Sequence, residues 1–84
     1  MNVSDIFRAN ATTRPDAVAW IDERRSGVTH ATLDAIIDAA AQRLLDAGVC
    51  AGQRVTTALD NGLPMLVVIM ALARIGAESI EIVP

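Results

Sequence analysis

This 84-residue sequence has a single histidine, His30, and a single cysteine, Cys50, and both types can act as nucleophiles, bases or metal ligands. A catalytic cysteine is held as a thiolate by a nearby base or by a helix N-terminus. Cys50 instead follows the predicted end of a helix, where the helix dipole disfavours negative charge. His30 has no second histidine or cysteine at the spacing of a metal site. We therefore expect an inert thiol and a half-exposed histidine at a helix start.

Two pairs of carboxylates are spaced closely enough for general acid–base work. Asp22 and Glu23 are adjacent in a polar turn, whereas Asp34 and Asp38 are four residues apart. The second spacing places both carboxylates on one face of a helix. Acid–base chemistry also needs an enclosing pocket, and the surrounding sequence predicts none. We expect both pairs to lie on solvated surfaces.

Residues 48–52 read GVCAG and superficially resemble a glycine-rich phosphate-binding loop. The lysine followed by serine or threonine that such loops need is missing, and the segment lies between a helix and a strand, the reverse of the required order. All seven cationic residues are arginine, so the sequence has no lysine for phosphate binding or Schiff-base chemistry. We predict no catalytic, cofactor-binding or metal-binding residue in this chain.

Charge and targeting patterns exclude several classes of protein. The net charge is −3, and Phe7 and Trp20 are the only aromatic residues, so the sequence has neither a basic stripe nor a stacking platform for nucleic acid. The longest apolar run, residues 63–73, is too short to span a bilayer, and the first eight residues do not resemble a signal peptide. A single cysteine permits no internal disulfide, which fits a reducing compartment. We expect a cytoplasmic protein.

Hydrophobic periodicity and turn residues predict an α/β fold. The expected order is an N-terminal helix, a small β-hairpin, an amphipathic helix, and then a strand–helix–strand unit. Because short turns join the last three elements, the two strands should be parallel, with a right-handed crossover between them. The expected bounds of the elements are residues 3–13, 17–21 with 28–29, 31–47, 54–59, 63–75 and 79–83.

Residues that favour helix ends stand beside the predicted helices. Asn2 or Ser4 can cap the first helix, and Thr29 can cap the second. Gly48 and Gly76 follow the second and third helices, where a left-handed backbone is favourable and glycine adopts it without a steric penalty. We predict a positive φ angle at both glycines.

The helix over residues 31–47 is expected to have one polar and one apolar face. Asp34, Asp38 and Arg43 should face water. The apolar positions recur at the helical period and should pack in the core. They are Leu33, Ile36, Ile37, Ala40 and Leu44.

The helix over residues 63–75 is apolar nearly all round, so it should be buried on more than one side, with Met65 and Met70 filling core space. Hydrophobic residues make up 52% of the sequence, although so short a chain buries little of its surface. The last two strands also leave open edges. The chain is therefore expected to be cut from a larger protein or to self-associate.

Three stretches follow one another in an order typical of a known family. Residues 14–19 (RPDAVA) are similar to the motif RPD-x-x-A, and residues 28–33 (VTHATL) to T-Y-x-E-L, with a helix that ends in LDAGV at 45–49. Residues 52–55 (GQRV) are similar to G-D-R-V, and residues 71–77 (ALARIGA) to A-x-x-x-G-A. Together they resemble the first part of the AMP-binding, or adenylate-forming, superfamily, which includes acyl-CoA synthetases, aryl-CoA ligases, luciferases and the adenylation domains of peptide synthetases.

The sequence departs from that family pattern at four positions. His30 stands in place of the usual tyrosine and Thr32 in place of glutamate, which removes a capping-box carboxylate. Gln53 replaces aspartate, and Glu81 stands where proline is usual. These are structural positions, so the resemblance implies the fold and leaves the subfamily open.

The resemblance implies that residues 1–84 are an incomplete part of the large N-terminal domain of an ATP-dependent acid–thiol ligase. In this family a carboxylate attacks the α-phosphate of Mg-ATP, and the acyl group of the adenylate then passes to coenzyme A or carrier-protein pantetheine. The family's phosphate loop, nucleotide-binding motifs and catalytic lysine lie later in the chain. ATP, magnesium and coenzyme A (or pantetheine) are thus implied for the parent enzyme and not for this segment, which should be inactive alone.

Two other interpretations stay open. A free-standing small α/β interaction module that dimerises through its apolar helix would have the same composition. A small cofactor-binding domain is the third, and the missing G-x-G-x-x-G motif argues against it. The expected partner is the remainder of the parent enzyme or a second copy of the chain, including a strand-exchanged dimer, and neither nucleic acid nor membrane.

Overall fold

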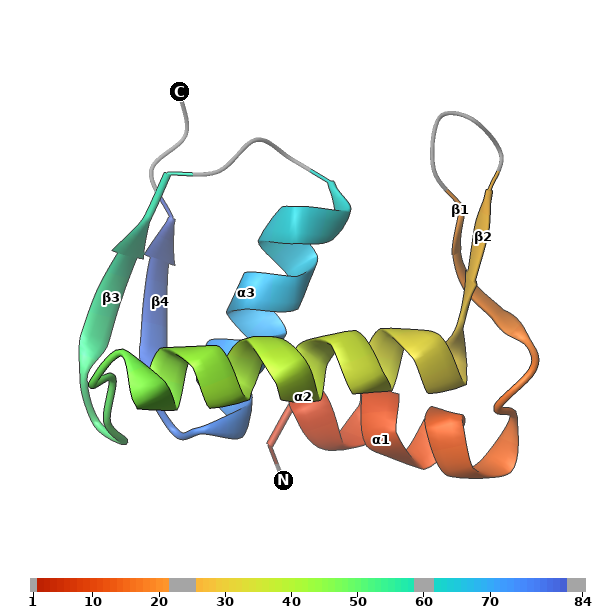
Figure 1. The fold of residues 1–84 in the computed structure, drawn as a ribbon, viewed down its shortest axis with the longest axis horizontal. Coiled ribbons are helices and arrows are strands. Elements are labelled where there is room, and N and C mark those ends of the chain that lie inside the picture. Colours follow the sequence, from red (N-terminus) through yellow and green to blue (C-terminus); the bar gives the residue numbers. More distant parts are fainter. Residues whose placement is uncertain (1, 22–25, 59–61, 82–84) are drawn as a thin grey trace.

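The computed structural model describes residues 2–21, 26–58 and 62–81, and these ranges contain three helices and four strands (Figure 1). In chain order the elements are α1 (Ser4–Thr13), β1 (Val18–Ile21), β2 (Gly27–Thr29), α2 (His30–Asp46), β3 (Arg54–Thr57), α3 (Leu63–Arg74) and β4 (Glu78–Glu81). The predicted α/β order of helix, hairpin, helix and strand–helix–strand is confirmed.

Two separate two-stranded sheets flank the helices. β1 and β2 pair antiparallel, with an irregular register between Val18 and Trp20. β3 and β4 pair in parallel, with Arg54 beside Glu78, which confirms the predicted parallel arrangement. In Figure 1 the hairpin stands at one end of α2 and the parallel pair at the other. The helices therefore hold two small sheets apart.

The strand bounds differ from the predicted ones by a residue at several ends: β2 and β4 each begin one residue earlier than predicted. β1 begins one residue late because the N–H of Ala17 donates to the carbonyl of Arg14 (3.2 Å) in the preceding turn. β3 ends at Thr57, and Ala58 is not part of a strand. Predicted positions 59, 82 and 83, and the turn that contains the Asp22–Glu23 pair, lie outside the described residues.

The N-terminal caps agree in part with the prediction. The Thr29 hydroxyl accepts a hydrogen bond from the N–H of Thr32 (3.2 Å), so Thr29 caps α2. At α1 the side chain of Asn2 accepts from the N–H of Ser4 (2.9 Å), and the N–H of Asn2 donates to the Asp5 carboxylate (3.2 Å). Asn2, one of the two predicted candidates, thus supplies a side-chain acceptor just before α1. Ser4 as a cap is wrong, because its side chain is buried and its hydroxyl has no hydrogen-bond partner.

The C-terminal ends of α2 and α3 are both closed by glycine. The φ angles of Gly48 and Gly76 are 99° and 83°, so the predicted left-handed geometry is confirmed. After Gly76, the N–H of Ala77 donates back to the carbonyl of Leu72 (2.9 Å), and the residue after Gly48 makes the equivalent bond. This Schellman pattern satisfies carbonyls that the helix leaves unpaired.

Replacing Gly76 with alanine is expected to destabilise the fold more than Gly48→Ala does. A left-handed residue with a Cβ costs about 1–2 kcal/mol at either position. A Cβ on Gly76 would also lie 3.3 Å from the Cβ of Ala51, whereas a Cβ on Gly48 would have nothing within 4 Å. Urea denaturation of both variants measures the difference. Equal losses would show that Ala51 moves aside without cost.

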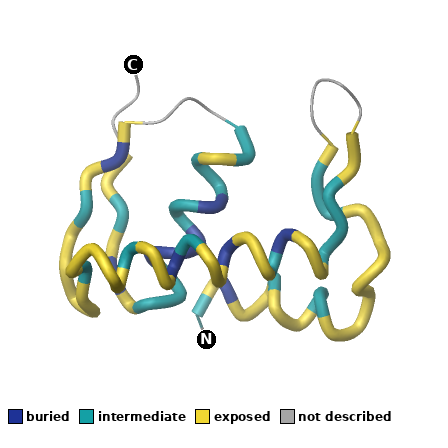
Figure 2. Tube along the Cα trace, viewed as in Figure 1, coloured by how far each residue is buried: buried dark blue, intermediate teal, exposed yellow. Residues whose placement is uncertain are grey.

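The hydrophobic core lies where α2 crosses α1 and α3. Figure 2 shows buried positions on α2 and α3 where the two helices meet. The largest fully buried apolar side chains of α2 are Leu33 and Ile37, whereas Ile36 remains 37% exposed. Ile36 was predicted to lie in the core; α2 is rotated so that Ala41 is buried instead. The buried cluster consists of Leu33, Ile37, Ala41, Val67, Met70 and Ala71.

α3 is buried on more than one side, as predicted. Val67 and Met70 face the core cluster, while Leu72 is fully buried outside that cluster. Met65 is half-buried and does not join the cluster, so its predicted role in the core is not observed. The exposed large apolar side chains lie on other elements of the described chain; they are Val3, Ile6, Val18, Ile21, Ile36, Leu45 and Ile80.

Candidate functional site

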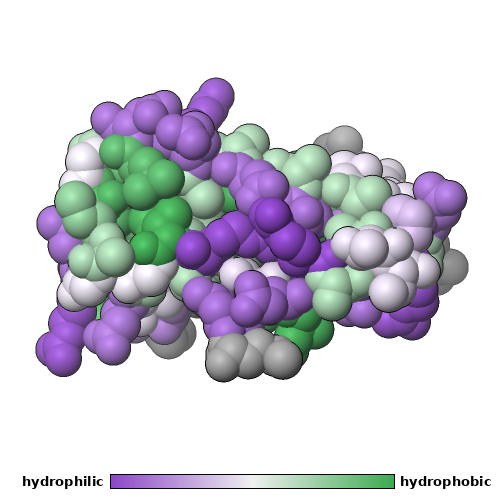
Figure 3. Space-filling view, turned by 90° about the horizontal axis from the view of Figure 1, so that it is seen from below, coloured by the Kyte–Doolittle hydropathy of each residue, from purple (hydrophilic) through white to green (hydrophobic). Residues whose placement is uncertain are grey.

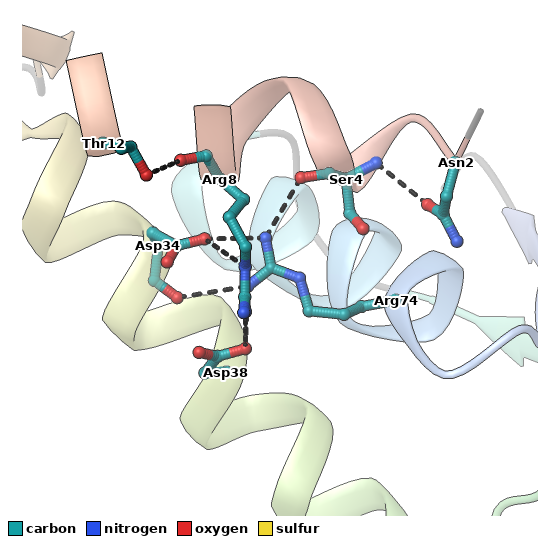
Figure 4. A network of polar contacts seen from close by, with 7 residues as sticks. All are labelled: Asn2, Ser4, Arg8, Thr12, Asp34, Asp38 and Arg74. Atoms are coloured by element: carbon teal, nitrogen blue, oxygen red, sulfur yellow. Dashed lines mark hydrogen bonds and ion pairs between the residues drawn. The ribbon is translucent and has the colours of Figure 1, made fainter. Parts of the chain in front are cut away.

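The one cluster of charged side chains that joins several elements of the described chain centres on Arg74, near the end of α3 (Figure 4). Its guanidinium donates to the Asp34 carboxylate (2.8 Å), to the Asp38 carboxylate (2.9 Å), and to the backbone carbonyl of Ser4 (3.1 Å). The Arg74 side chain is 13% exposed and that of Asp34 is 17% exposed. Arg74 therefore ties α1 and α2 to α3 through partly desolvated, charge-assisted hydrogen bonds.

A second arginine completes the cluster from α1. Arg8 donates to the Asp38 carboxylate (2.6 Å) and lies 3.7 Å from that of Asp34. Both Arg8 and Asp38 are about half exposed. Figure 3 shows the hydrophilic atoms along the middle of this face, next to a hydrophobic region at one end. The exposed half of the cluster contributes less than the Arg74–Asp34 half, because water screens it.

The prediction that Asp34 and Asp38 form a solvated pair is wrong for Asp34. Its carboxylate lies between two guanidinium groups at a junction of helices. The Asp34 carboxylate accepts from Arg74, and the Asp38 carboxylate accepts from both Arg74 and Arg8. The arrangement supports a structural role and not acid–base catalysis.

The glycine-rich segment after α2 is closed on itself. Most of its backbone N–H groups are already used: Gly52 donates to the carbonyl of Gly76 (2.8 Å), and Cys50 donates to the side chain of Gln53 (2.9 Å). Gly48 and Val49 donate to carbonyls of the last turn of α2. A phosphate cradle needs free N–H groups that point at the ligand. Four of the five N–H groups of the segment are thus bonded within the chain.

His30 and Cys50 lie at opposite ends of α2. His30 begins α2 and is half-buried, as predicted, and its Nδ1 atom has no hydrogen-bond partner. Cys50 is exposed in the loop before β3, where its thiol approaches the carbonyl of Gly48 (3.5 Å). Neither contacts the arginine cluster through a described hydrogen bond. They form no catalytic pair.

Metal and membrane chemistry find no support in the described residues. Within residues 2–21, 26–58 and 62–81 no group of three or more histidine, cysteine or carboxylate side chains could hold a metal ion. In the same ranges, no helix has the length and the apolar character that crossing a membrane requires. Within the described ranges, the arginine cluster is therefore the strongest candidate site.

The family model for AMP-binding enzymes matches residues 7–84. The chain belongs to the AMP-binding enzyme family. Among relatives of this AMP-binding chain, Malpibaldin synthetase of Mortierella alpina is 34% identical over 82 residues, which cover 98% of the chain and 2% of that protein. The medium-chain fatty-acid–CoA ligase of Escherichia coli (strain K12) is 26% identical over 83 residues, which cover 99% of the chain and 15% of that protein.

A solved structure contains the same fold. The N-terminal subdomain of Klebsiella oxytoca NpsA superimposes with a TM-score of 0.89 and 26% identity, covering 96% of this AMP-binding chain and 21% of that one. The chain thus corresponds to the N-terminal part of acyl-CoA ligases and adenylation enzymes. It spans at most 21% of these three proteins. The family implies ATP for the parent enzyme, while the described residues show no place for it.

Proposed function

We propose that this chain is the N-terminal scaffold segment of an ATP-dependent acyl- or aryl-CoA ligase, or of a related adenylating enzyme, in the cytoplasm. The parent enzyme would join a carboxylate to AMP and then pass the acyl group to a thiol, with magnesium and coenzyme A or carrier-protein pantetheine as further participants. The name of one relative, a medium-chain fatty-acid–CoA ligase, favours a medium-chain fatty acid as the carboxylate.

The Arg74 cluster is the observation that carries the proposal. Its groups satisfy one another and fasten three helices together, which is what a scaffold requires. The other candidate groups support the same conclusion: the Gly48–Gly52 loop uses its own N–H groups, and His30 and Cys50 stand apart. Adenylation needs groups that stabilise a transferring phosphoryl charge, whereas the arginines of the cluster, Arg8 and Arg74, are already paired with carboxylates.

The chain alone is expected to give no carboxylate-dependent ATP–pyrophosphate exchange. The reason is the missing lysine and the self-satisfied Gly48–Gly52 loop. Exchange of labelled pyrophosphate into ATP, with medium-chain fatty acids as substrates, measures the activity. Full-length Escherichia coli medium-chain ligase serves as the positive control. Exchange that rises in proportion to the concentration of the chain would contradict the proposal.

A second readout tests nucleotide binding without turnover. A ligand that binds the folded state raises the free energy of unfolding by RT ln(1 + [L]/Kd). We expect the thermal midpoint of the chain to be unchanged by millimolar Mg-ATP. An upward shift that saturates with ATP would place a nucleotide site within residues 1–84. The reading frame after residue 84 gives an independent check, because a serine-, threonine- and glycine-rich loop with a lysine should follow.

A further inference from the structure

α1 adds no fully buried apolar side chain to the core. The buried cluster consists of residues from α2 and α3, and Phe7 of α1 packs against it while only partly buried. Val3, just before α1, and Ile6, within it, are both about half exposed. Figure 2 shows exposed positions along most of this helix. Because segments with few buried apolar contacts open at a lower free energy than the core, α1 is the least strongly held of the three described helices.

The chain changes its attachment directly after α1. The N–H of Arg14 donates back into α1 (2.8 Å), and the backbone of Arg14 (φ −138°, ψ 58°) is neither helical nor extended. The carbonyl of Pro15 instead accepts from the N–H of Ala31 (3.1 Å), and that of Ala17 accepts from the first N–H of α2 (3.0 Å). The chain from Pro15 onward is thus tied to the start of α2. α1 can rotate about Arg14 without breaking these two bonds.

The arginine cluster holds α1 less firmly than it holds α2 to α3. The mostly buried pair of Arg74 and Asp34 joins α2 to α3, so it persists when α1 moves. The charged contact that belongs to α1 is the pair of Arg8 and Asp38, and both side chains are about half exposed. Exposed pairs are weak and are screened by salt. The attachment of α1 should therefore depend on ionic strength.

The first turn of α1 is bonded to the end of α3 at an unfavourable position. The carbonyl of Ser4 accepts from Arg74 (3.1 Å), and the side-chain amide of Asn2 donates to the carbonyl of Ala73. Ser4 is 1% exposed, and its hydroxyl has no hydrogen-bond partner. A buried hydroxyl without a partner costs free energy that water recovers when the group is exposed. Ser4 thus favours the open position of α1.

We propose that α1 is a strap, which opens as a unit about Arg14 while α2, α3 and both sheets stay folded. When closed, the strap lies over one side of the Arg74 cluster (Figure 4). Opening releases the Ser4 carbonyl from Arg74 and leaves the bonds of Arg74 to Asp34 and Asp38 in place. The strap adds an ionic-strength-sensitive movement to a scaffold whose α2–α3 part stays fixed, and it involves no step of adenylation.

Hydrogen exchange in the full-length protein that contains residues 1–84 measures the opening. We expect the amides of residues 8–13 to exchange about tenfold faster than those of residues 33–44, because the strap opens without the core. At about 1 M salt, where the screening length falls to about 3 Å, exchange in α1 should become faster still while α2 stays unchanged. Equal rates in the two helices, or rates in α1 that salt leaves unchanged, would overturn the proposal.

Ser4→Ala gives a result that simple weakening of a contact would not. It should slow exchange in residues 8–13 about fivefold, because the closed strap no longer buries an unpaired hydroxyl. Thr12→Ala is the matched control: it raises helix propensity at an exposed position of α1, where the hydroxyl bonds only to its own helix. It should slow exchange by less than about threefold. Faster exchange in Ser4→Ala than in the wild type would contradict the strap.

Arg8→Gln tests the salt dependence from the protein side. It should speed exchange in α1 about twofold to fivefold, the range for an exposed ion pair, and remove most of the effect of salt. Arg54→Gln, in the exposed pair of the parallel sheet, should leave α1 unchanged. An Arg8→Gln protein that matches the wild type at both salt concentrations would refute the proposal. These rates can be read whether or not the protein adenylates a carboxylate, so the strap is tested separately from the scaffold function.

Discussion

Replacing Arg74 with leucine is expected to lower the free energy of unfolding by about 3 kcal/mol, because removing one partner of a buried ion pair strands the other charge. Asp34, at 17% exposure, would be left with the more distant Arg8 as its remaining ionic partner. The carbonyl of Ser4 would lose its donor as well. An 84-residue domain has a total stability of about 4–13 kcal/mol, so urea denaturation should show the loss clearly.

The matched control is the exposed pair on the parallel sheet. Arg54→Leu removes the ion pair with Glu78, in which the arginine side chain is 75% exposed and the glutamate side chain 70% exposed. Such exposed pairs contribute less than about 1 kcal/mol to the free energy of unfolding. The double variant Arg74→Leu with Asp34→Leu should recover part of the loss, because no charge is then left unpaired. If Arg74→Leu and Arg54→Leu lower the free energy of unfolding by the same amount, the arginine cluster does not hold the three helices together as we infer.

Truncating Ile37 to alanine is expected to destabilise the fold by about 2–5 kcal/mol, the range for a buried isoleucine that leaves a cavity. Ile37 is fully buried between α2 and its neighbours. The adjacent Ile36, which is 37% exposed, provides the same chemical change at a position turned out of the core. Ile36→Ala should cost less than about 1 kcal/mol, as surface substitutions usually do.

Thermal and urea unfolding of the two alanine variants measure that contrast. We expect Ile37→Ala to unfold at a much lower temperature and urea concentration than Ile36→Ala. This difference tests how α2 is rotated about its axis, since the sequence pattern places both isoleucines in one apolar stripe. Similar midpoints for the two variants would mean that α2 turns a different face to α1 and α3 than the structure describes.

The fold could be predicted from local signals because each element carries its own. Thr29 and Gly48 bracket α2, Gly76 ends α3, and the alternation of strand and helix after residue 54 requires a parallel pair. What local signals missed was orientation. The apolar stripe of α2 includes both Ile36 and Ile37, so the sequence pattern does not distinguish them. Packing against α1 and α3 buries Ile37 and leaves Ile36 partly exposed.

The arginine cluster could be predicted only in half. The spacing of Asp34 and Asp38 was visible, but their partner Arg74 lies 40 and 36 residues away and belongs to another helix. Nothing local marks an arginine at the end of an apolar helix as a buried one. One signal was available in the sequence: Arg74 is the single charged residue of α3. A lone charge in a helix that is buried on two sides is rarely left unpaired, so carboxylates should lie near it.

The hydrogen bond from Arg74 to the carbonyl of Ser4 can form only late in the synthesis of the chain. Its ends are 70 residues apart, and the side-chain amide of Asn2 likewise donates to the carbonyl of Ala73. At about 5–20 residues per second, the ribosome needs roughly 4–14 s to make the intervening chain. The last 28 residues, from Asp46 to Arg74, take about 1.4–6 s of that time. During it α1 and α2 can meet, while the core side of α2 is not yet covered by α3. The speed of translation between residues 46 and 74 thus decides how long Leu33 and Ile37 are open to chaperones and to aggregation.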